Sequence, residues 1–130
     1  MRILITGSRD WPDPDIIARA ILELNDNNQL DWDTLVIVHG DCPTGADAMA
    51  EQFAQRYDVQ TERHPADWKA FGKFAGPKRN QEMVDLGANV CLAFPMAGSR
   101  GTMHCIKAAK AAGIPVKIYP YTTRDEEAFT

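Results

Sequence analysis

The chain has 130 residues, of which 45% are hydrophobic and 25% are charged, and this composition excludes a disordered, collagen-like or coiled-coil protein. The length suits one domain over residues 1–130, and no apolar run approaches the roughly 18 residues that a bilayer crossing needs. The first residues enter a strand-like segment directly, so we expect no signal peptide and no membrane partner. Three cysteines, an odd number, favour a reduced cytoplasmic protein over a disulfide framework.

The formal net charge of −4 is unevenly distributed along the chain. Residues 1–58 carry 11 acidic and 4 basic side chains, whereas residues 59–79 carry 2 acidic and 5 basic ones. The acidic total argues against a broad, charge-driven surface for nucleic acid. The basic stretch at 59–79 is still compatible with one small anionic ligand.

Five short segments rich in β-forming residues follow one another along the chain. Most are near-continuous apolar runs, which are typical of strands buried on both faces of a parallel sheet. The third contains Gln, Thr and Glu and suits an edge strand. The predicted strands cover Arg2–Thr6, Leu35–His39, Val59–His64, Val90–Phe94 and Val116–Tyr119.

Four helix-like segments separate these strands. Asp13 and Pro14 are typical of an N-cap and a first helical residue. The second helix covers Gly45–Tyr57, the third runs from about Pro77 to Gly87, and the fourth from Thr102 as N-cap to Gly113. The inner faces of the first two helices consist of Ile17, Ala20, Ile21, Leu24, Ala46, Ala50, Phe53, Ala54 and Tyr57. Residues 66–76 form a loop or a short helix, and we expect the polar tail at 120–130 to be loosely ordered.

This alternation predicts an α/β fold, a Rossmann-like open parallel five-stranded sheet with helices on both faces. The expected strand order is 3-2-1-4-5, so the order reverses between the first and fourth strands. Sheets of this kind bind ligands at the carboxyl ends of their strands, beside that reversal. Three strand-to-helix loops meet there, and they cover residues 7–11, 39–47 and 97–102.

These loops contain glycines and small hydroxyl residues, which suit a phosphate-binding site. Glycine allows close approach of a ligand to the backbone, and the N-terminus of the fourth helix offers free N–H groups and a positive dipole. The alternative is an ordinary helix cap with glycines for turning. The loops at 7–11 and 97–102 match neither a Walker A motif nor a Gly-x-Gly-x-x-Gly motif. The sequence therefore supports neither P-loop hydrolysis nor ordinary dinucleotide redox chemistry.

Two further positions are candidates for the same crevice. Asp47, in the first turn of the second helix, could hold ribose hydroxyls or a divalent ion, or merely complement the helix dipole. Arg79 and Asn80 begin the third helix and should reach the ligand. We expect the ligand to contact Gly7, Ser8, Arg9, Asp10, Trp11, Gly40, Asp41, Thr44, Gly45, Asp47, Arg79, Asn80, Gly98, Ser99, Arg100, Gly101 and Thr102.

The cysteines and histidines predict no metal site. His39, Asp41 and Cys42 lie close in sequence, but their spacing matches no zinc pattern. Cys42 is either a nucleophile with His39 as its base or, more simply, a loop thiol. We expect Cys91 and Cys105 to fill the core, and His104 to lie on the helix surface. His64 faces either the ligand or solvent.

Aromatic side chains alternate with cations in the segment that we call the basic–aromatic segment. Its members are Arg63, His64, Trp68, Lys69, Phe71, Lys73, Phe74, Lys78 and Arg79. A nucleobase with phosphates requires stacking surfaces and cations of this kind. The alternative is a small hydrophobic lid with solvated lysines.

Four motifs together resemble the YspA-type branch of the SLOG superfamily, Rossmann-like proteins related to the DprA/Smf and LOG proteins. They are Gly7-Ser8-Arg9-Asp10-Trp11, the run from His39 to Asp47, Lys78-Arg79-Asn80-Gln81-Glu82-Met83 and Ser99-Arg100-Gly101-Thr102. The resemblance covers nearly the whole chain. It implies a nucleotide or nucleotide-derived ligand in the crevice, and phage, plasmid or other mobile-element settings.

LOG enzymes, more distant relatives, are phosphoribohydrolases that cleave the N-glycosidic bond of nucleoside monophosphates. Their signature Pro-Gly-Gly-x-Gly-Thr-x-x-Glu aligns with residues 97–105, where Gly101 and Thr102 are kept and Cys105 replaces the Glu. Arg79 falls on the LOG arginine, and Asn80 replaces the following lysine. Because cleavage needs a carboxylate near an oxocarbenium-like state, Asp47, Asp41 or Asp10 would have to substitute for the Glu. Asp47 and Arg79 are the candidate catalytic residues.

Three functions follow as hypotheses. The first is a domain that binds a nucleotide-like small molecule as a sensor or processing module. The second is a nucleotide N-glycosidase, a hydrolase. The third is DprA-like binding of single-stranded nucleic acid, which the acidic total charge disfavours. No cofactor is required, although Mg²⁺ could accompany a nucleotide, and analogy suggests a homodimer.

Overall fold

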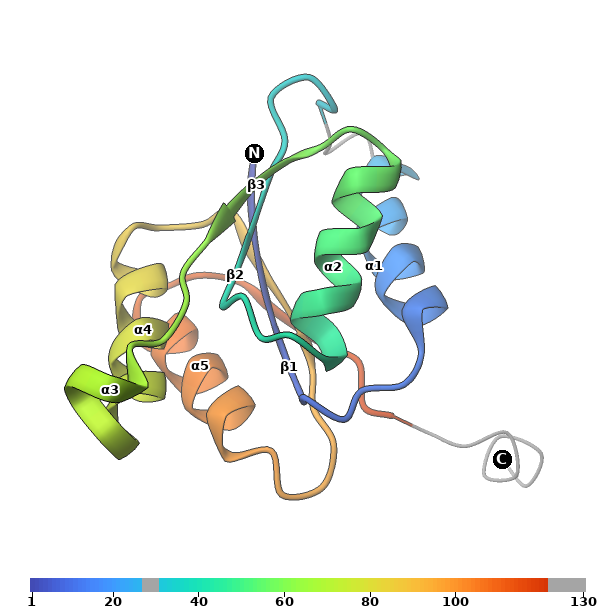
Figure 1. Ribbon diagram of the computed structural model, residues 1–130. Helices are drawn as coiled ribbons and strands as arrows, with labels where there is room; N and C mark the ends of the chain where they lie inside the picture. Colours follow the sequence, from blue (N-terminus) through green and yellow to red (C-terminus); the bar gives the residue numbers. More distant parts are fainter. Residues whose placement is uncertain (27–30, 122–130) are drawn as a thin grey trace.

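The computed structural model describes residues 1–26 and 31–121 (Figure 1). Strands and helices alternate in the predicted order, and most of the expected tail at 120–130 lies outside the described residues. The elements are β1 (Arg2–Gly7), α1 (Pro14–Asp26), β2 (Val36–His39), α2 (Gly45–Arg56), β3 (Gln60–Arg63), α3 (Trp68–Phe71), the 3-10 helix η1 (Gly72–Phe74), α4 (Ala75–Asp85), β4 (Val90–Phe94), α5 (Arg100–Ala111) and β5 (Val116–Ile118).

All neighbouring strands are parallel, and their order is β3-β2-β1-β4-β5, which confirms the predicted fold class and topology. The central strand β1 pairs with both sides of the sheet, since Leu4 lies opposite Val38 of β2 and Cys91 of β4. The strand order therefore reverses at β1, and the carboxyl ends of β2, β1 and β4 lie side by side.

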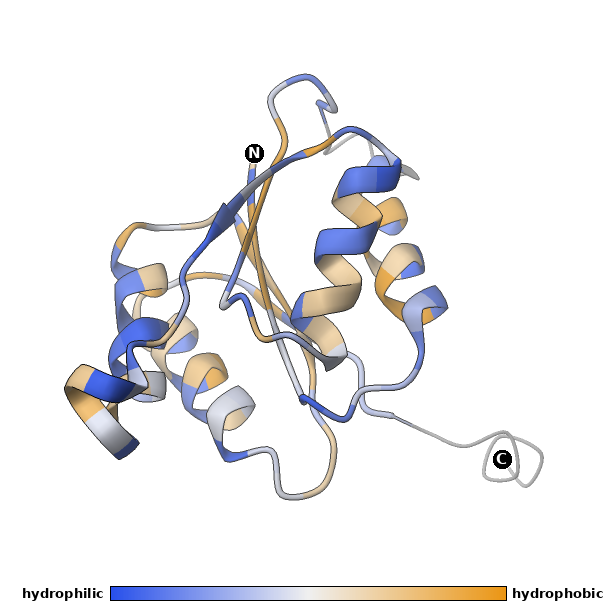
Figure 2. Cartoon of the chain, viewed as in Figure 1, coloured by the Kyte–Doolittle hydropathy of each residue, from blue (hydrophilic) through white to orange (hydrophobic). Residues whose placement is uncertain are grey.

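Helices cover both faces of the sheet, as expected for near-continuous apolar strands. Helices α1 and α2 lie on one face and α4 and α5 on the other (Figure 1). The side chains of β1 alternate accordingly, because Ile3 and Ile5 pack with α1 and α2 while Leu4 packs with Met83 and Cys105. Figure 2 shows the apolar central strands between helices whose outer surfaces are hydrophilic.

The helix ends follow from local chemistry, with two corrections. The carboxylate of Asp13 accepts a hydrogen bond from the N–H of Asp15 at 3.0 Å, as an N-cap should. Helix α4 begins at Ala75 rather than Pro77, which places Pro77 in the first turn, where its missing N–H costs no helical hydrogen bond. Tyr57 is 45% exposed, not buried, because it caps α2 beyond the last inward turn and packs on Phe53.

None of the helices in the described parts of the chain combines the length and the apolar character that a membrane crossing requires.

Candidate functional site

A cavity of about 960 Å³ lies at the carboxyl ends of β1, β2 and β4. Its wall is built by the loops that follow these strands, by the segment after β3 and by the start of α4 and α5. The volume falls in the range of small-molecule sites. The lining residues are Ile5, Thr6, Gly7, Ser8, Arg9, Asp10, Gly40, Asp41, Cys42, Pro43, Asp47, Pro65, Ala66, Trp68, Lys73, Gly76, Pro77, Arg79, Asn80, Met83, Ala97, Gly98, Ser99, Arg100, Gly101, Thr102 and His104.

The β1–α1 loop places Ser8 at the centre of this wall. The carbonyl oxygen of Ser8 accepts hydrogen bonds from the N–H groups of Trp11 and Ala46, at 3.2 and 3.1 Å. Its hydroxyl oxygen accepts from the N–H of Asp10 at 3.0 Å. These bonds leave the hydroxyl proton of Ser8 able to donate to a ligand.

Gly45 and Thr44 hold the loops together and do not line the cavity. Gly45 has a φ of +72°, and a Cβ there would collide with the backbone of Ser8 and Arg9. Thr44 donates from Oγ1 to the carbonyl oxygen of Arg9 at 3.0 Å. The glycine therefore allows α2 to approach the β1–α1 loop, and the predicted ligand contacts of both residues are corrected to loop-to-loop contacts.

Trp11 is also corrected, because it belongs to the core. Its side chain is 1% exposed, and its ring packs edge-on against Phe94 and Tyr121 at centroid distances of 5.4 and 5.5 Å. The indole Nε1–H donates to the carbonyl oxygen of Asp13 at 2.9 Å. Trp11 thus fixes the path of the loop and does not line the cavity.

Asp47 lines the cavity from the first turn of α2, and only 8% of it is exposed. Its Oδ2 accepts a hydrogen bond from the N–H of Cys42 at 3.2 Å. Burial raises the pKa of Asp47, and the charges of His39 and Arg79 together with backbone hydrogen bonds offset that rise only in part. The site therefore contains a carboxyl group that holds its proton more tightly than an exposed aspartate.

Arg79 and Asn80 connect three elements at the cavity wall. Arg79 donates from Nη1 to the carbonyl oxygens of Gly40 and His64, at 2.6 and 3.3 Å, and from Nε to Oδ1 of Asn80 at 2.8 Å. Asn80 in turn donates from Nδ2 to the carbonyl oxygen of Gly101 at 3.1 Å. This chain of bonds joins β2, α4 and α5, and it holds the guanidinium in a fixed position at the wall.

The N-terminus of α5 opens toward the cavity. The helix is capped by Ser99 and begins at Arg100, so Thr102 is not the N-cap, as predicted, but a buried residue of the first turn. No acidic residue occupies this turn, and the Ser99 side chain makes no cap hydrogen bond. The positive end of the α5 dipole therefore faces the cavity, and no carboxylate in the first turn of α5 neutralises it.

His39 is committed to the protein interior. It is fully buried, its Nδ1 accepts from the N–H of Asp41 at 3.0 Å, and its Nε2 lies 2.8 Å from Oε1 of Glu51. Burial alone would raise the pKa of Glu51, but hydrogen bonds from His39, Gln55 and Arg63 outweigh it and lower that pKa. His39 thus positions the β2–α2 loop, and neither of its nitrogens is aimed at the Cys42 thiol.

The position of the LOG glutamate is occupied by a buried thiol. Cys105 lies beside Cys91 and Thr6, and both cysteines are fully buried, which confirms that they fill the core. The hydrogen bond between the thiols, together with burial, raises the pKa of Cys91. The same hydrogen bond lowers the pKa of Cys105, although burial acts in the opposite direction. No carboxylate can reach the cavity from this position of α5.

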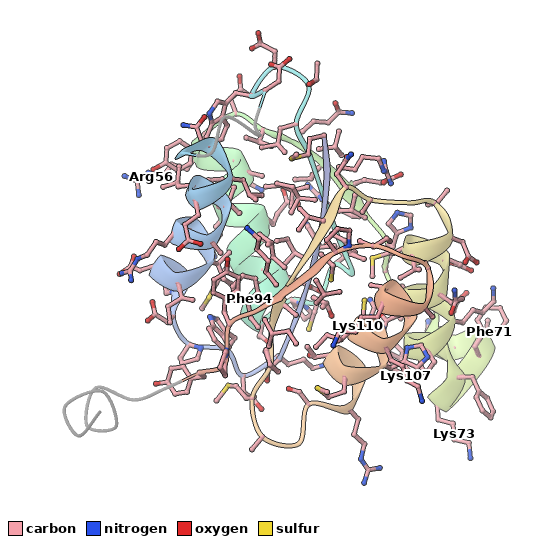
Figure 3. The ribbon with its side chains drawn as sticks, turned by 180° about the vertical axis from the view of Figure 1, so that it is seen from behind. Arg56, Phe71, Lys73, Phe94, Lys107 and Lys110 are labelled. Carbon is pink, nitrogen blue, oxygen red and sulfur yellow. The ribbon has the colours of Figure 1, made fainter. Side chains whose placement is uncertain are left out.

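The basic–aromatic segment divides into two parts. Trp68, Lys73 and Arg79 line the cavity. The other aromatic rings are exposed and pair with lysines, since Lys78 lies 4.9 Å from the ring centre of Phe71 and Lys73 lies 5.3 Å from that of Phe74. Figure 3 shows Phe71 at the outer edge of the molecule. The predicted stacking surface is therefore reduced at the cavity to Trp68.

Several lining residues do not follow from the loop motifs. His104 was predicted on the helix surface, yet it lines the cavity, and its Nδ1 is buried without a hydrogen-bond partner among the described residues. It lies one helical turn after Gly101, and that spacing is the signal that could have placed it. Thr6 and Pro65 also line the cavity, but no motif marks them.

Comparisons with known proteins identify a family and a relative with similar sequences. A sequence model of the family described as "YspA, cpYpsA-related SLOG family" matches residues 1–71. The Gene 61 protein of Mycobacterium phage D29 is 45% identical over 120 residues, which are 88% of this chain and 93% of that protein. Its phage origin fits the setting that the sequence motifs imply.

Among solved structures, the C-terminal domain of a Pyrococcus furiosus hydrogenase is 16% identical, with a TM-score of 0.44. The alignment covers 90% of this chain and 89% of that one. This likeness is too remote to inform function.

Proposed function

The chain belongs to the YspA, cpYpsA-related SLOG family, and from that membership we propose that it binds a nucleotide or nucleotide-derived molecule in the cavity at the carboxyl ends of β1, β2 and β4. One observation supports this most strongly. The cavity joins a helix N-terminus whose N-cap side chain makes no cap hydrogen bond, the hydroxyl groups of Ser8 and Thr102, and a fixed guanidinium in one wall. Such a set of donors is suited to phosphate oxygens.

The phosphate of the ligand lies between the β1–α1 loop and the start of α5 in this proposal. Ser8 and Thr102 supply hydroxyl donors, and both are buried in the wall. Arg100 adds an exposed cation at the rim. Asp47, a buried lining residue, supplies carboxylate oxygens to the ribose hydroxyls, since a buried carboxylate needs donors to replace water.

Mg²⁺ would enter with the ligand and not occupy a cage made by the protein. Among residues 1–26 and 31–121, no group of three His, Cys, Asp or Glu side chains could hold a metal ion. Mg²⁺ is commonly bound through one or two carboxylates together with ligand phosphates. Titrations with and without Mg²⁺ test this arrangement, and an affinity that rises with Mg²⁺ supports it.

The experiment is a thermal-shift screen followed by calorimetric titration. Its panel contains nucleoside monophosphates, cyclic nucleotides, ADP-ribose and NAD. Arg100→Ala should weaken binding of a hit about tenfold, because it removes a charged donor. The matched control is Lys110→Ala, an exposed cation in the last turn of the same helix, outside the cavity wall (Figure 3). No stabilisation by any member of the panel, or equal affinities in both variants, contradicts the proposal.

A second candidate function is hydrolysis of the N-glycosidic bond of a bound nucleotide. The observation that favours it is the raised pKa of Asp47 at the cavity wall. A protonated carboxyl group can donate its proton to the leaving base while water adds to C1′. The resulting carboxylate stabilises positive charge on the sugar and then takes up the proton that the added water releases, which restores the carboxyl group. Because Cys105 is buried, Asp47 would take this role in place of the LOG glutamate.

Incubation with nucleoside 5′-monophosphates and chromatography for free base tests this second candidate. Asp47→Asn should abolish release of base, whereas Asp41→Asn, which changes a more exposed lining carboxylate, should not. Absence of free base from the wild type would leave a binding site without turnover. Release of base at full rate by Asp47→Asn would contradict the role of Asp47.

A further inference from the structure

Trp68 is an aromatic surface held at the cavity wall. It begins α3, which is capped by Asp67 through a hydrogen bond from the N–H of Ala70 at 3.1 Å. The far edge of its indole rests on α4, since a Cβ added to Gly76 would lie 3.2 Å from Cη2. The side chain is nevertheless 48% exposed and lines the cavity. A large ring is thus supported at one edge while much of its surface stays open.

Arg9 approaches this ring from the opposite wall. Its guanidinium carbon lies 5.5 Å from the centre of the Trp68 ring, so the β1–α1 loop and α3 meet across the cavity. Within the described residues, the Arg9 guanidinium forms no hydrogen bond or ion pair. The cation–π contact is therefore its one specific partner there, and such contacts at exposed sites are weak.

We propose that Trp68 is the platform on which the base of the ligand stacks, and that the base displaces Arg9, which then turns to the phosphate. This inference rests on the proposed nucleotide binding. A ring stacked between the indole and the guanidinium would need about 3.5 Å on each side, roughly 7 Å in all. The observed 5.5 Å leaves no room for it. The base and the guanidinium therefore exchange places on the indole.

The exchange matches the chemistry of the two partners. A nucleobase offers a flat face without charge, and stacking on an aromatic side chain is stronger than an exposed cation–π contact. The released guanidinium gains a phosphate, with which it forms charge-assisted hydrogen bonds. The loop that carries Arg9 also carries Ser8, which we place at the phosphate.

Phe74 provides the matched control, because it belongs to the same basic–aromatic segment. It is 66% exposed, pairs with Lys73 and does not line the cavity. Truncation of Phe74 removes a similar exposed ring without touching the proposed platform. Arg56→Ala is the control for the charge of Arg9, because Arg56 lies on the far side of the molecule from Lys73 (Figure 3).

Binding of nucleoside 5′-monophosphates and of ribose 5-phosphate, which lacks the base, separates the two contacts. Trp68→Ala should weaken nucleotide binding about 5- to 150-fold, the loss typical of one stacked base, and leave ribose 5-phosphate binding unchanged. Arg9→Ala should weaken both ligands. Phe74→Ala and Arg56→Ala should weaken neither.

The outcomes distinguish failure of this inference from failure of the proposed function. If the wild type binds neither class of ligand, the proposed function itself fails for these ligands, and the stacking role fails with it. If the wild type binds nucleotides and Trp68→Ala binds them equally well, or loses both classes equally, the stacking role alone is overturned.

Fluorescence gives a second readout that does not require truncation of the ring. Trp11 is buried in the core and Trp32 packs on Phe53 and Tyr57, so Trp68 is the tryptophan that a ligand in the cavity can quench. A bound nucleotide should quench wild-type emission. Trp68→Phe should keep affinity within about threefold, because a ring remains, and should lose the quenching. Quenching that persists in Trp68→Phe overturns the proposal.

Discussion

Arg79 donates a hydrogen bond from Nη1 to the carbonyl oxygen of Gly40 at 2.6 Å. The guanidinium occupies the space that a Cβ at position 40 would need, so only glycine fits there without displacing it. A Cβ on Gly40 would also lie 3.0 Å from Oδ2 of Asp47. The glycine at the end of β2 therefore sets the position of a cation and of a carboxyl group at the cavity wall.

Substitution of Gly40 by Ala should impair binding more than folding. The Arg79 guanidinium ends a flexible side chain and can move aside, so we expect the free energy of unfolding to fall by only about 1 kcal/mol. Displacement of a fixed cation from the wall should weaken nucleotide binding about tenfold. Urea unfolding and calorimetric titration measure the two effects.

The control for stability is Gly101→Ala in the first turn of α5. A Cβ there would meet no atom within 4 Å, so the free energy of unfolding should rise by about 0.5 kcal/mol through the better helix propensity of alanine. Wild-type nucleotide affinity in Gly40→Ala would show that Arg79 does not contact the ligand.

Alanine substitutions at Gly45 and Gly98 distinguish two causes of lost stability, backbone strain and steric collision. Both have positive φ, +72° and +80°, but only a Cβ on Gly45 would meet other atoms, those of the Ser8 and Arg9 backbone. Gly98→Ala should lower the free energy of unfolding by about 1 kcal/mol, and Gly45→Ala by roughly 3 kcal/mol or more. Equal losses in urea unfolding would show that α2 does not depend on this close approach to the β1–α1 loop.

Asp47 should make stability depend on pH in an unusual direction. Burial raises its pKa above 3.8 in the folded chain, so the folded state retains the proton to a higher pH than the unfolded state does. The stability that Asp47 contributes is therefore complete below pH 3.8 and is lost as pH rises through the raised pKa. The side chain of Asp47→Asn cannot ionise, so the wild type should lose stability relative to this variant as the pH increases through the raised pKa of Asp47. Urea unfolding from about pH 3 to pH 7 measures the difference.

Glu51→Gln is the control, because the stability that Glu51 contributes should change with pH in the opposite direction to that of Asp47. Hydrogen bonds from His39, Gln55 and Arg63 lower the pKa of Glu51 from 4.5, so its contribution is present above that pH and is lost in acid. The deficit of Glu51→Gln relative to wild type should be largest near neutral pH and should shrink as pH falls. If both variants shift in the same direction with pH, the burial of Asp47 is not the cause of the effect.

The three cysteines should differ in reactivity. Cys42 is partly exposed at the cavity, whereas Cys91 and Cys105 are fully buried between β4 and α5. A thiol reagent should therefore modify one cysteine rapidly in the native protein and all three in denaturant. Rapid modification of Cys91 or Cys105 under native conditions would contradict their burial.

The fold could be predicted because strong local signals agree with each other. The apolar strands end at glycine or proline, as after Phe94, and Asp13 and Pro14 mark the start of α1. Continuous apolar strands require helices on both faces, and right-handed crossovers then leave few possible strand orders. Burial of Cys91 and Cys105 follows from the same pattern.

The details of the site could be predicted only where backbone position decides them. Ser8 and Gly101 reach the cavity because strand ends and helix starts must meet at the reversal of strand order. Trp11 could not be placed, because its burial depends on Phe94 and Tyr121, which are distant in sequence. His104 could be placed only through Gly101, since helical spacing puts the two residues on one face of α5 but does not by itself say that this face meets the cavity.

A titration followed by amide chemical shifts in NMR tests most directly whether this cavity binds a nucleotide. Addition of a nucleoside monophosphate should move the backbone signals of Ser8, Gly101 and Thr102 and the indole signal of Trp68. Signals of α1, on the opposite side of the sheet from α4 and α5, should stay in place. Shifts that are absent at saturating ligand, or that cluster away from these residues, would contradict the account.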